Sequence, residues 1–369
     1  MLYLNCQFNY FTDIFTIMEP TPAILIISPE EMRNCFKAIL QKEGFSDEKA
    51  MECATIFTDN SIDGVYTHGV NRFPRFVKYI RDGFVKADAV PTLKHAFGGM
   101  EQWDGHLGPG PSNAVHASSS AMRLATKHGI GCVALSNTNH WMRAGNYAWN
   151  AAKQGFVFIA WTNTIANMPA WGAVDARVGN NPLVMALPYQ NEAIVLDMAM
   201  SQYSLGHMEL VAMRNDVLPV NAGFDQQGNL TNDPSAILAT RRLLPAGYWK
   251  GTGLALLLDI LSAVLSGGLS TCEISKENVE YGLSQVFIAI DISKFSNHSA
   301  ISKVVENIIK DYHRSVPSDA AQKIMYPGER VLQTRYKNLA AGIPVQKKIW
   351  DIVMGIYDGS NDLSVIKYT

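Results

Sequence analysis

Two apolar segments separated by only a few residues constrain the fold of this chain more than any other feature. The segments, PLVMALP (182–188) and AIVLDM (193–198), are each short enough to be a single strand. So short a connection is typical of an antiparallel hairpin. Three more short apolar segments, CVALS (132–136), FVFIAW (156–161) and QVFIAIDI (285–292), are expected to join them. The sequence therefore predicts an α/β fold with a mixed, largely antiparallel sheet.

Helices are expected on both sides of this central region. A serine–proline–glutamate capping pattern from Ser28 opens a helix that ends at Gly44, and further helices are expected over 46–62 and 74–83. Between the strands, helices are expected over 112–128 and 144–155, and amphipathic helices follow the last strand. We therefore expect an N-terminal extension (1–24), a helical domain built from both chain ends (25–110 plus 295–369), and a mixed-sheet domain (111–294).

Charge and hydropathy argue against two classes of partner. The 369 residues include 31 basic and 33 acidic side chains, interspersed along the chain, for a net charge of −2. A nucleic-acid-binding surface needs a basic face, so no nucleic acid partner is expected. The apolar run 253–266 is too short to span a bilayer and contains Asp259, so no membrane partner is expected either.

The N-terminal segment and the cysteines favour a cytoplasmic location. The first basic residue is Arg33, so the positive region of a secretory signal is missing. Residues 1–24 are interpreted as an extension, with Met18 as an alternative start. The five cysteines, an odd number without a CxxC pair, are typical of reduced cysteines in a cytoplasmic protein.

The common short signatures of cofactor, metal and nucleophile sites are missing from the sequence. It contains neither GxGxxG after a strand nor GxxxxGK[ST]. The nine histidines include no HxH or HExxH pair, so no metal site is expected, and there is no GxSxG elbow. The fragment KGTGLAL, from Lys250, either binds phosphate at a helix start or is a glycine turn before a buried helix.

Two loops each carry a histidine followed closely by an arginine. In GVYTHGVNRFPRF, His68 lies beside glycine, Arg72 stands four residues on near a helix start, and a second arginine follows. In NTNHWMRAGN, just past an expected strand, His140 and Arg143 repeat this arrangement. Imidazole and guanidinium groups together suit a small, anionic, hydroxyl-rich substrate, although solvated loops would have the same composition.

With these loops, the segments AWTNTIANMPAWGA, GNNPLVMALP, DMAMSQYS and LLPAGYWKGTGLAL resemble the type-2 malate/L-lactate dehydrogenase family from about residue 27 to the end. Members of that family are NAD(P)-dependent oxidoreductases of 2-keto or 2-hydroxy acids, with a dinucleotide-binding fold distinct from the Rossmann fold. The resemblance implies that His68 is the catalytic histidine, with Thr67 in place of the usual serine. Arg72 matches the arginine of the same motif, and His140 and Arg143 are expected to bind further substrate oxygens.

The resemblance also implies which residues contact the cofactor. They are Ala193, Ile194, Val195, Leu196, Asp197, Met198 and Ala199 in one strand segment, the pair Trp249 and Lys250, and the turn Gly328, Glu329 and Arg330. Asn180 departs from the threonine that many members have before NPL. HWMR in place of the commoner HFG fits the branch that acts on a diketo-sugar acid and argues against malate or lactate.

The implied reaction is reduction of a keto-sugar acid by NADH, with NADPH as the alternative cofactor. His68 would give a proton to the alkoxide that forms as hydride reaches the ketone, while Arg72 would hold the carboxylate. Two alternatives are a sister dehydrogenase of malate, lactate or ureidoglycolate, and a non-enzymatic binder of sugar acids. The expected partners are the small keto acid and a second copy of the chain, because members of the family are dimers and much apolar surface needs covering.

Overall fold

The computed structural model describes residues 23–277, 279–359, 363 and 366. The expected extension over residues 1–24, including Met18, therefore lies outside the described residues except for its last two positions.

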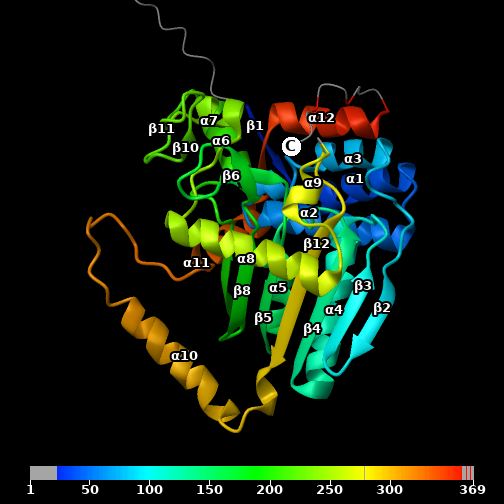
Figure 1. Ribbon diagram of the computed structural model, residues 1–369, viewed down its shortest axis with the longest axis vertical. Coiled ribbons are helices and arrows are strands. Elements are labelled where there is room, and N and C mark those ends of the chain that lie inside the picture. The colour runs from blue at the N-terminus through cyan, green and yellow to red at the C-terminus, as the bar shows by residue number, and fades with distance from the viewer. Residues whose placement is uncertain (1–22, 278, 360–362, 364–365, 367–369) are drawn as a thin grey trace, which may run out of the picture.

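A seven-stranded sheet forms the centre of the molecule (Figure 1). Its strands, in spatial order, are β2 (Thr92–Phe97), β3 (Met100–Asp104), β4 (Ile130–Thr138), β12 (Leu283–Asp291), β5 (Phe156–Thr162), β8 (Leu183–Tyr189) and β9 (Glu192–Met198). Within this sheet β3 and β4 pair in parallel, and the other neighbouring strands are antiparallel. The mixed, largely antiparallel sheet and its β8–β9 hairpin are confirmed.

The sheet begins earlier in the chain than the sequence predicts. Its strands were expected within 111–294, whereas β2 and β3 supply one edge from the segment assigned to the helical domain. Every residue of β2 is exposed, because an edge strand with little cover on either face has no buried side. An alternating hydrophobic pattern is therefore absent, and periodicity gives no signal there.

Helices cover both faces of the sheet. α4 (Gly110–His128) and α5 (Ala144–Lys153) pack on one face, and α8 (Trp249–Ser266) crosses the other (Figure 1). Phe158 and Phe287 belong to the core beneath α4 and α5, whereas Trp161 and Val286 belong to the core beneath α8. Successive strand residues thus point to opposite faces, and both faces are apolar.

α8 is the helix of the described chain that has the length and apolar composition of a membrane span. One side of it packs on the sheet. The Asn181 Nδ2 donates to the Ala255 carbonyl at 2.8 Å, and the Trp161 Nε1 donates to the Leu258 carbonyl at 3.2 Å. Its other side carries exposed leucine, isoleucine and valine side chains.

Helices from both ends of the chain form a layer beside the sheet. They are α1 (Pro29–Lys42), α2 (Asp47–Ile62) and α3 (Phe73–Arg81) from the first part, and α11 (Glu329–Ala341) and α12 (Lys347–Tyr357) from the last. β1 (Ile24–Ile27) pairs with β13 (Ile343–Gln346) and ties the two parts together. The hydroxyls of Ser28 and Ser46 accept hydrogen bonds from the N–H groups of Glu31 and Lys49, which confirms the expected helix starts.

The remaining elements lie at the edges of this arrangement. They are η1 (Tyr66–His68), β6 (Ala166–Pro169), β7 (Ala176–Gly179), α6 (Leu205–Ala212), β10 (Gly223–Phe224), β11 (Leu230–Thr231), α7 (Pro234–Thr240), α9 (Thr271–Ile274), η2 (Ile292–Lys294) and α10 (His298–Tyr312). α6, α7, β10 and β11 form a small lobe, and α10 projects from the sheet away from the helical layer (Figure 1). α10 contacts β8 and η2, so it is not part of that layer although the sequence places it in the helical domain.

Candidate active site

The loop that carries His68 is anchored to the end of α2 by buried polar side chains. Asn60 Nδ2 donates to the His68 carbonyl at 2.9 Å, and the Ser61 hydroxyl accepts from the Val70 N–H at 2.9 Å. A Cβ at Gly69 would lie 2.2 Å from the Ser61 hydroxyl, so the loop can approach α2 only with glycine there. The backbone is thereby fixed, and the half-buried His68 ring points from a rigid loop.

His68 and His140 come together although they lie in different loops. Their ring centroids are 5.7 Å apart and the ring planes are inclined by 21°. The Met142 N–H donates to Nδ1 of His140 at 3.0 Å, so the proton of the neutral ring lies on Nε2. Thr67 Oγ1 lies 3.2 Å from Nδ1 of His68, so the threonine that replaces the usual serine keeps a hydroxyl beside the ring.

Both imidazoles are held in the neutral form. Burial, followed by the Arg72 and Arg143 guanidiniums, lowers the pKa of His68 to about 3. Burial, followed by Arg72 and His68, lowers the pKa of His140 well below its ordinary value. The site therefore disfavours added positive charge in the absence of an anion.

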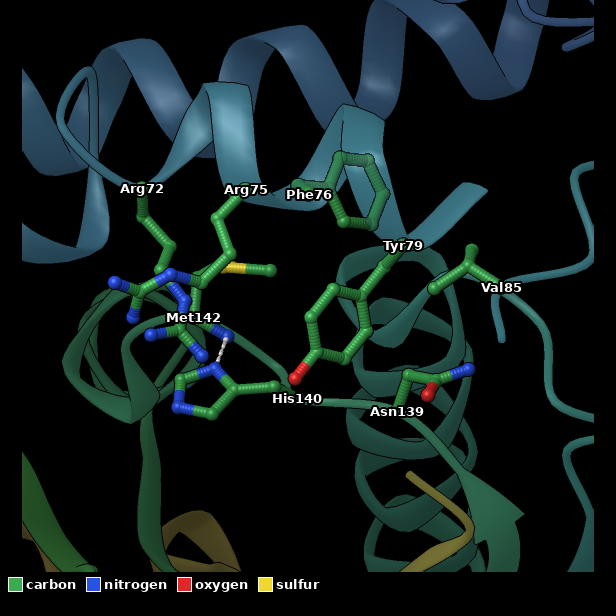
Figure 2. A pocket seen from close by; sticks show the side chains of 8 residues that line it. All are labelled: Arg72, Arg75, Phe76, Tyr79, Val85, Asn139, His140 and Met142. Atoms are coloured by element: carbon green, nitrogen blue, oxygen red, sulfur yellow. Dashed lines mark hydrogen bonds between the residues drawn. The ribbon is translucent and has the colours of Figure 1, made fainter. Parts of the chain in front are cut away.

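A pocket that is partly open to solvent, with about 260 Å³ of empty space, lies beside His140 (Figure 2). It is lined by Arg72, Arg75, Phe76, Tyr79, Val85, Asn139, His140 and Met142. Figure 2 shows the Arg72 and Arg75 side chains reaching from α3 toward the His140 ring, with Asn139 at the opposite end.

The two arginines give the pocket its positive charge. Burial, followed by the neighbouring Arg75 guanidinium, lowers the pKa of Arg72 to about 10, which leaves it charged at neutral pH. No carboxylate lies within ion-pair distance of Arg72 among the described residues. The nearest acidic influence is the buried Glu280, which accepts from the Ile165 N–H at 3.0 Å. Two neighbouring guanidiniums whose positive charge is offset by few nearby carboxylates are typical of an anion-binding site.

Asn139 lies at the other end of the pocket, and one of its polar atoms lacks a partner. Its Nδ2 donates to three backbone carbonyls, those of Phe84, Leu107 and Gly108. Its Oδ1 is buried and has no hydrogen-bond partner among the residues that the structure describes. Because a buried acceptor without a donor is costly, a ligand hydroxyl that reached this oxygen would stabilise the complex.

Arg143 does not face the pocket, contrary to the expectation that it binds substrate. Its guanidinium pairs with the carboxylates of Asp63 and of Asp197, the latter at 3.2 Å from Nε. Asp63 also accepts two hydrogen bonds from Arg335, at 2.6 and 2.8 Å. The Arg143 side chain is only 6% exposed, so its donors are committed to the protein. Arg143 therefore positions the loops around the site.

Arg75 is not among the residues that the sequence predicts to bind substrate. The sequence carried the signal, because Arg72 and Arg75 are three residues apart and thus share one face of a helix. Phe73 and Val77 on the other face are buried in the core, where the Phe73 ring packs against Phe36 of α1 and Phe57 of α2. That packing turns both arginines toward the pocket.

The segments expected to contact the cofactor gather around β9. The Val195 N–H donates to the Pro327 carbonyl at 3.0 Å, which places the turn Gly328–Arg330 against the strand. The Ala246 N–H donates to the Met200 carbonyl at 2.8 Å, so the turn before Trp249 and Lys250 lies at the end of the same strand. In the described chain the three segments therefore border one stretch of surface.

The residues at this surface fit a dinucleotide. Gly328 has φ 96°, and a Cβ there would lie 3.2 Å from the Val195 nitrogen, so glycine lets this turn pack closely on the strand. Helices α8 and α11 begin here, and helix starts attract phosphate. Lys250 and Arg330 add positive charge beside them, and Trp249 offers an exposed ring. Asp197 is different, because it accepts from the Gly145 N–H and pairs with Arg143.

The first glycine after Lys250, Gly251, has a packing role. A Cβ at Gly251 would lie 2.2 Å from the Ala246 carbonyl oxygen, so this glycine lets α8 start directly on the preceding turn. No cluster of metal-binding side chains occurs in the described part of the chain.

The chain is similar to known proteins along most of its length. The sequence model of the malate/L-lactate dehydrogenase family matches residues 27–353. The 2,3-diketo-L-gulonate reductase of Haemophilus influenzae is 41% identical over 325 residues, 88% of this chain and 98% of that protein. The reductase of the same name from Pasteurella multocida is 42% identical over 332 residues, 89% of this chain and 99% of that protein. The malate dehydrogenase structure from Pyrococcus horikoshii is 26% identical, with a TM-score of 0.83 over 93% of this chain and 98% of that one.

Proposed function

The chain belongs to the malate/L-lactate dehydrogenase family and is an oxidoreductase, and on that premise we propose that it reduces 2,3-diketo-L-gulonate to 3-keto-L-gulonate with NADH. The observation that carries this proposal is the pocket beside His68 and His140, with two guanidiniums at one end and an unpaired amide oxygen at the other. The guanidiniums suit the carboxylate of a keto acid. The Asn139 oxygen suits a hydroxyl of a sugar chain, which pyruvate and oxaloacetate lack.

In the proposed complex the substrate carboxylate pairs with Arg72. Its negative charge offsets the guanidinium that helps to lower the pKa of His68, so the imidazole becomes easier to protonate once substrate is bound. Protonated His68 then donates to the ketone oxygen as negative charge develops there. His140, with its proton on Nε2, donates a hydrogen bond to the same oxygen or its neighbour.

The nicotinamide, when bound, supplies the hydride. We propose that Lys250 and Arg330, with the first turns of α8 and α11, hold the phosphates of the dinucleotide. The backbone from Ala193 to Ala199 and the turn at Gly328, which packs on that strand, would support the rest of the cofactor. Glu329 is held by His313 and Lys323, at 3.0 and 3.3 Å, and so would fix the turn.

We further propose that the protein is a cytoplasmic homodimer that uses the exposed side of α8. Leu254, Leu257, Leu261 and Val264 form a stripe along this side, with Val264 69% exposed. Such a continuous apolar stripe is typical of a protein interface. The helix that carries it begins at Trp249, so the interface would adjoin the proposed cofactor surface.

A substrate panel tests the proposed reaction. Loss of the NADH absorbance band is followed with 2,3-diketo-L-gulonate, oxaloacetate, pyruvate and oxidised ureidoglycolate, and then with NADPH in place of NADH. The diketo acid with NADH is expected to give the largest kcat/KM. A larger value for another keto acid would assign the chain to a sister dehydrogenase. If none of them is consumed, the proposed reaction is wrong, and failure to bind NADH as well would favour the non-enzymatic sugar-acid binder.

A further inference from the structure

The Arg75 guanidinium faces the pocket and makes few interactions with the rest of the described chain. Its described ion pair joins Nη2 to the Glu209 carboxylate of α6 at 3.8 Å, which is too long for a hydrogen bond. Glu209 is 43% exposed, so this pair contributes little to stability. The Arg75 side chain is itself only 20% exposed and lies against the pocket.

One carboxylate does not account for both arginines. A guanidinium grips a carboxylate through two parallel hydrogen bonds, and Arg72, which has no ion pair among the described residues, suffices for that role. A second guanidinium beside it then has donors left for another oxygen. Arg72 is the N-cap residue of α3 and Arg75 lies three residues further on, in its first turn, so an oxygen bound by Arg75 would lie close to the carboxylate bound by Arg72.

We propose that Arg75 binds the oxygen on the carbon next to the reacting ketone and thereby selects keto acids that carry an oxygen at that position. This rests on the proposed function, since it concerns the same pocket. In a 2,3-diketo acid the group bound is the second carbonyl. In a 3-hydroxy-2-keto acid it is the hydroxyl. Pyruvate has a methyl group there and offers Arg75 nothing to bind.

A structural role for Arg75 is the competing explanation. The Arg75–Glu209 pair links α3 to α6, and α6 packs closely on the His68 loop, because a Cβ at Gly206 would lie 2.8 Å from Cβ of Thr67. If the arginine served only this link, removing either partner would have the same effect. Glu209→Gln breaks the charge pair and leaves the guanidinium in the pocket, so it is the matched control.

The experiment measures the ratio of kcat/KM for 2,3-diketo-L-gulonate to kcat/KM for pyruvate in the wild type, Arg75→Met, Arg75→Lys and Glu209→Gln. Loss of a charged hydrogen bond to substrate is expected to lower this ratio about 10- to 100-fold in Arg75→Met. Arg75→Lys should lose less, because it keeps the charge but not the planar fork. Glu209→Gln should keep the wild-type ratio. An unchanged ratio in Arg75→Met, or an equal fall in Glu209→Gln, would overturn the assignment.

A second substrate pair separates this inference from the proposed function. Hydroxypyruvate and pyruvate also differ by one oxygen beside the ketone, and neither is a sugar acid. If the wild type fails to reduce the diketo acid, the proposed substrate is wrong, and Arg75 is then judged on this pair alone. A lower hydroxypyruvate-to-pyruvate ratio in Arg75→Met supports its role, and an unchanged ratio refutes it. Thermal unfolding of each variant shows that it is folded.

Discussion

The imidazole rings of His68 and His140 lie nearly parallel, with centroids 5.7 Å apart. Burial and the Arg72 guanidinium lower the pKa of both rings, and the charge of His68 further lowers the pKa of His140. Two protonated rings this close would repel each other. The arrangement therefore accommodates a single added proton. An anionic substrate at Arg72 supplies the charge that makes this proton favourable, which links proton uptake to substrate binding.

His68→Asn should lose most of the reductase activity and keep cofactor binding. Removing the proton donor is expected to lower kcat by about 10²- to 10⁴-fold, the usual contribution of general acid catalysis. Asparagine is close in size to histidine, and the loop stays anchored through Asn60 and Ser61. Steady-state kinetics give the loss, and energy transfer from tryptophan to NADH reports binding. Full activity in a variant that still binds NADH would contradict the role of His68.

Reduction should slow as pH rises. In the free protein the pKa of His68 is lowered to about 3, so a proton must be taken up before or with the substrate. Above this pKa the protonated fraction falls tenfold per pH unit, and log(kcat/KM) for the keto acid should fall with a slope approaching about −1. Oxidation of the hydroxy acid needs neutral His68 and should not share this decline. A flat profile for reduction would show that His68 does not deliver the proton.

His68 should also make the protein less stable in acid. The unfolded chain protonates histidine below about pH 6.5, while the folded protein resists this down to about pH 3, so the free energy of unfolding falls with pH across that window. Between about pH 6.5 and pH 5, His68 should lower the free energy of unfolding by at most about 2 kcal/mol. Solvent around this half-buried ring weakens the charge effects and so makes the change smaller. Urea unfolding of wild type and His68→Asn at both pH values measures it. Parallel changes in the two proteins would contradict this prediction.

The parts of the fold that could be predicted are those with a local signal. The caps at Ser28 and Ser46 and the β8–β9 hairpin are set by neighbouring residues, and the structure confirms them. The edge strand β2 was missed because all of its residues are exposed. Arg143 was assigned to the substrate because it follows His140 in a loop after a strand, whereas Asp63, 80 residues earlier, pairs with it in the fold. Such long-range partners leave no mark on local sequence.

Arg143→Met should destabilise the fold far more than removal of an exposed ion pair. It would leave Asp63 and Asp197 as buried carboxylates with one partner fewer, and breaking a buried pair typically costs about 3–5 kcal/mol. Arg177→Met is the control, since Arg177 is 77% exposed and pairs with the exposed Asp175. That change should leave the unfolding midpoint in urea unaltered. Similar midpoints for both variants would show that the Arg143 network contributes little.

Leu257→Asp should separate the proposed dimer and weaken NADH binding. Leu257 is 57% exposed in the middle of the α8 stripe, and a carboxylate there would be buried without a partner in a two-fold interface that uses the same helix twice. Val90→Asp is the control, because Val90 is 60% exposed and belongs to the segment before β2 and not to α8. Sedimentation at micromolar concentration should give about twice the chain mass for wild type and Val90→Asp, and the chain mass for Leu257→Asp. Because α8 starts at Trp249 and Lys250, loss of the interface should raise the Kd for NADH. A monomeric wild type, or a monomeric variant with unchanged NADH affinity, would show that the cofactor surface forms within one chain.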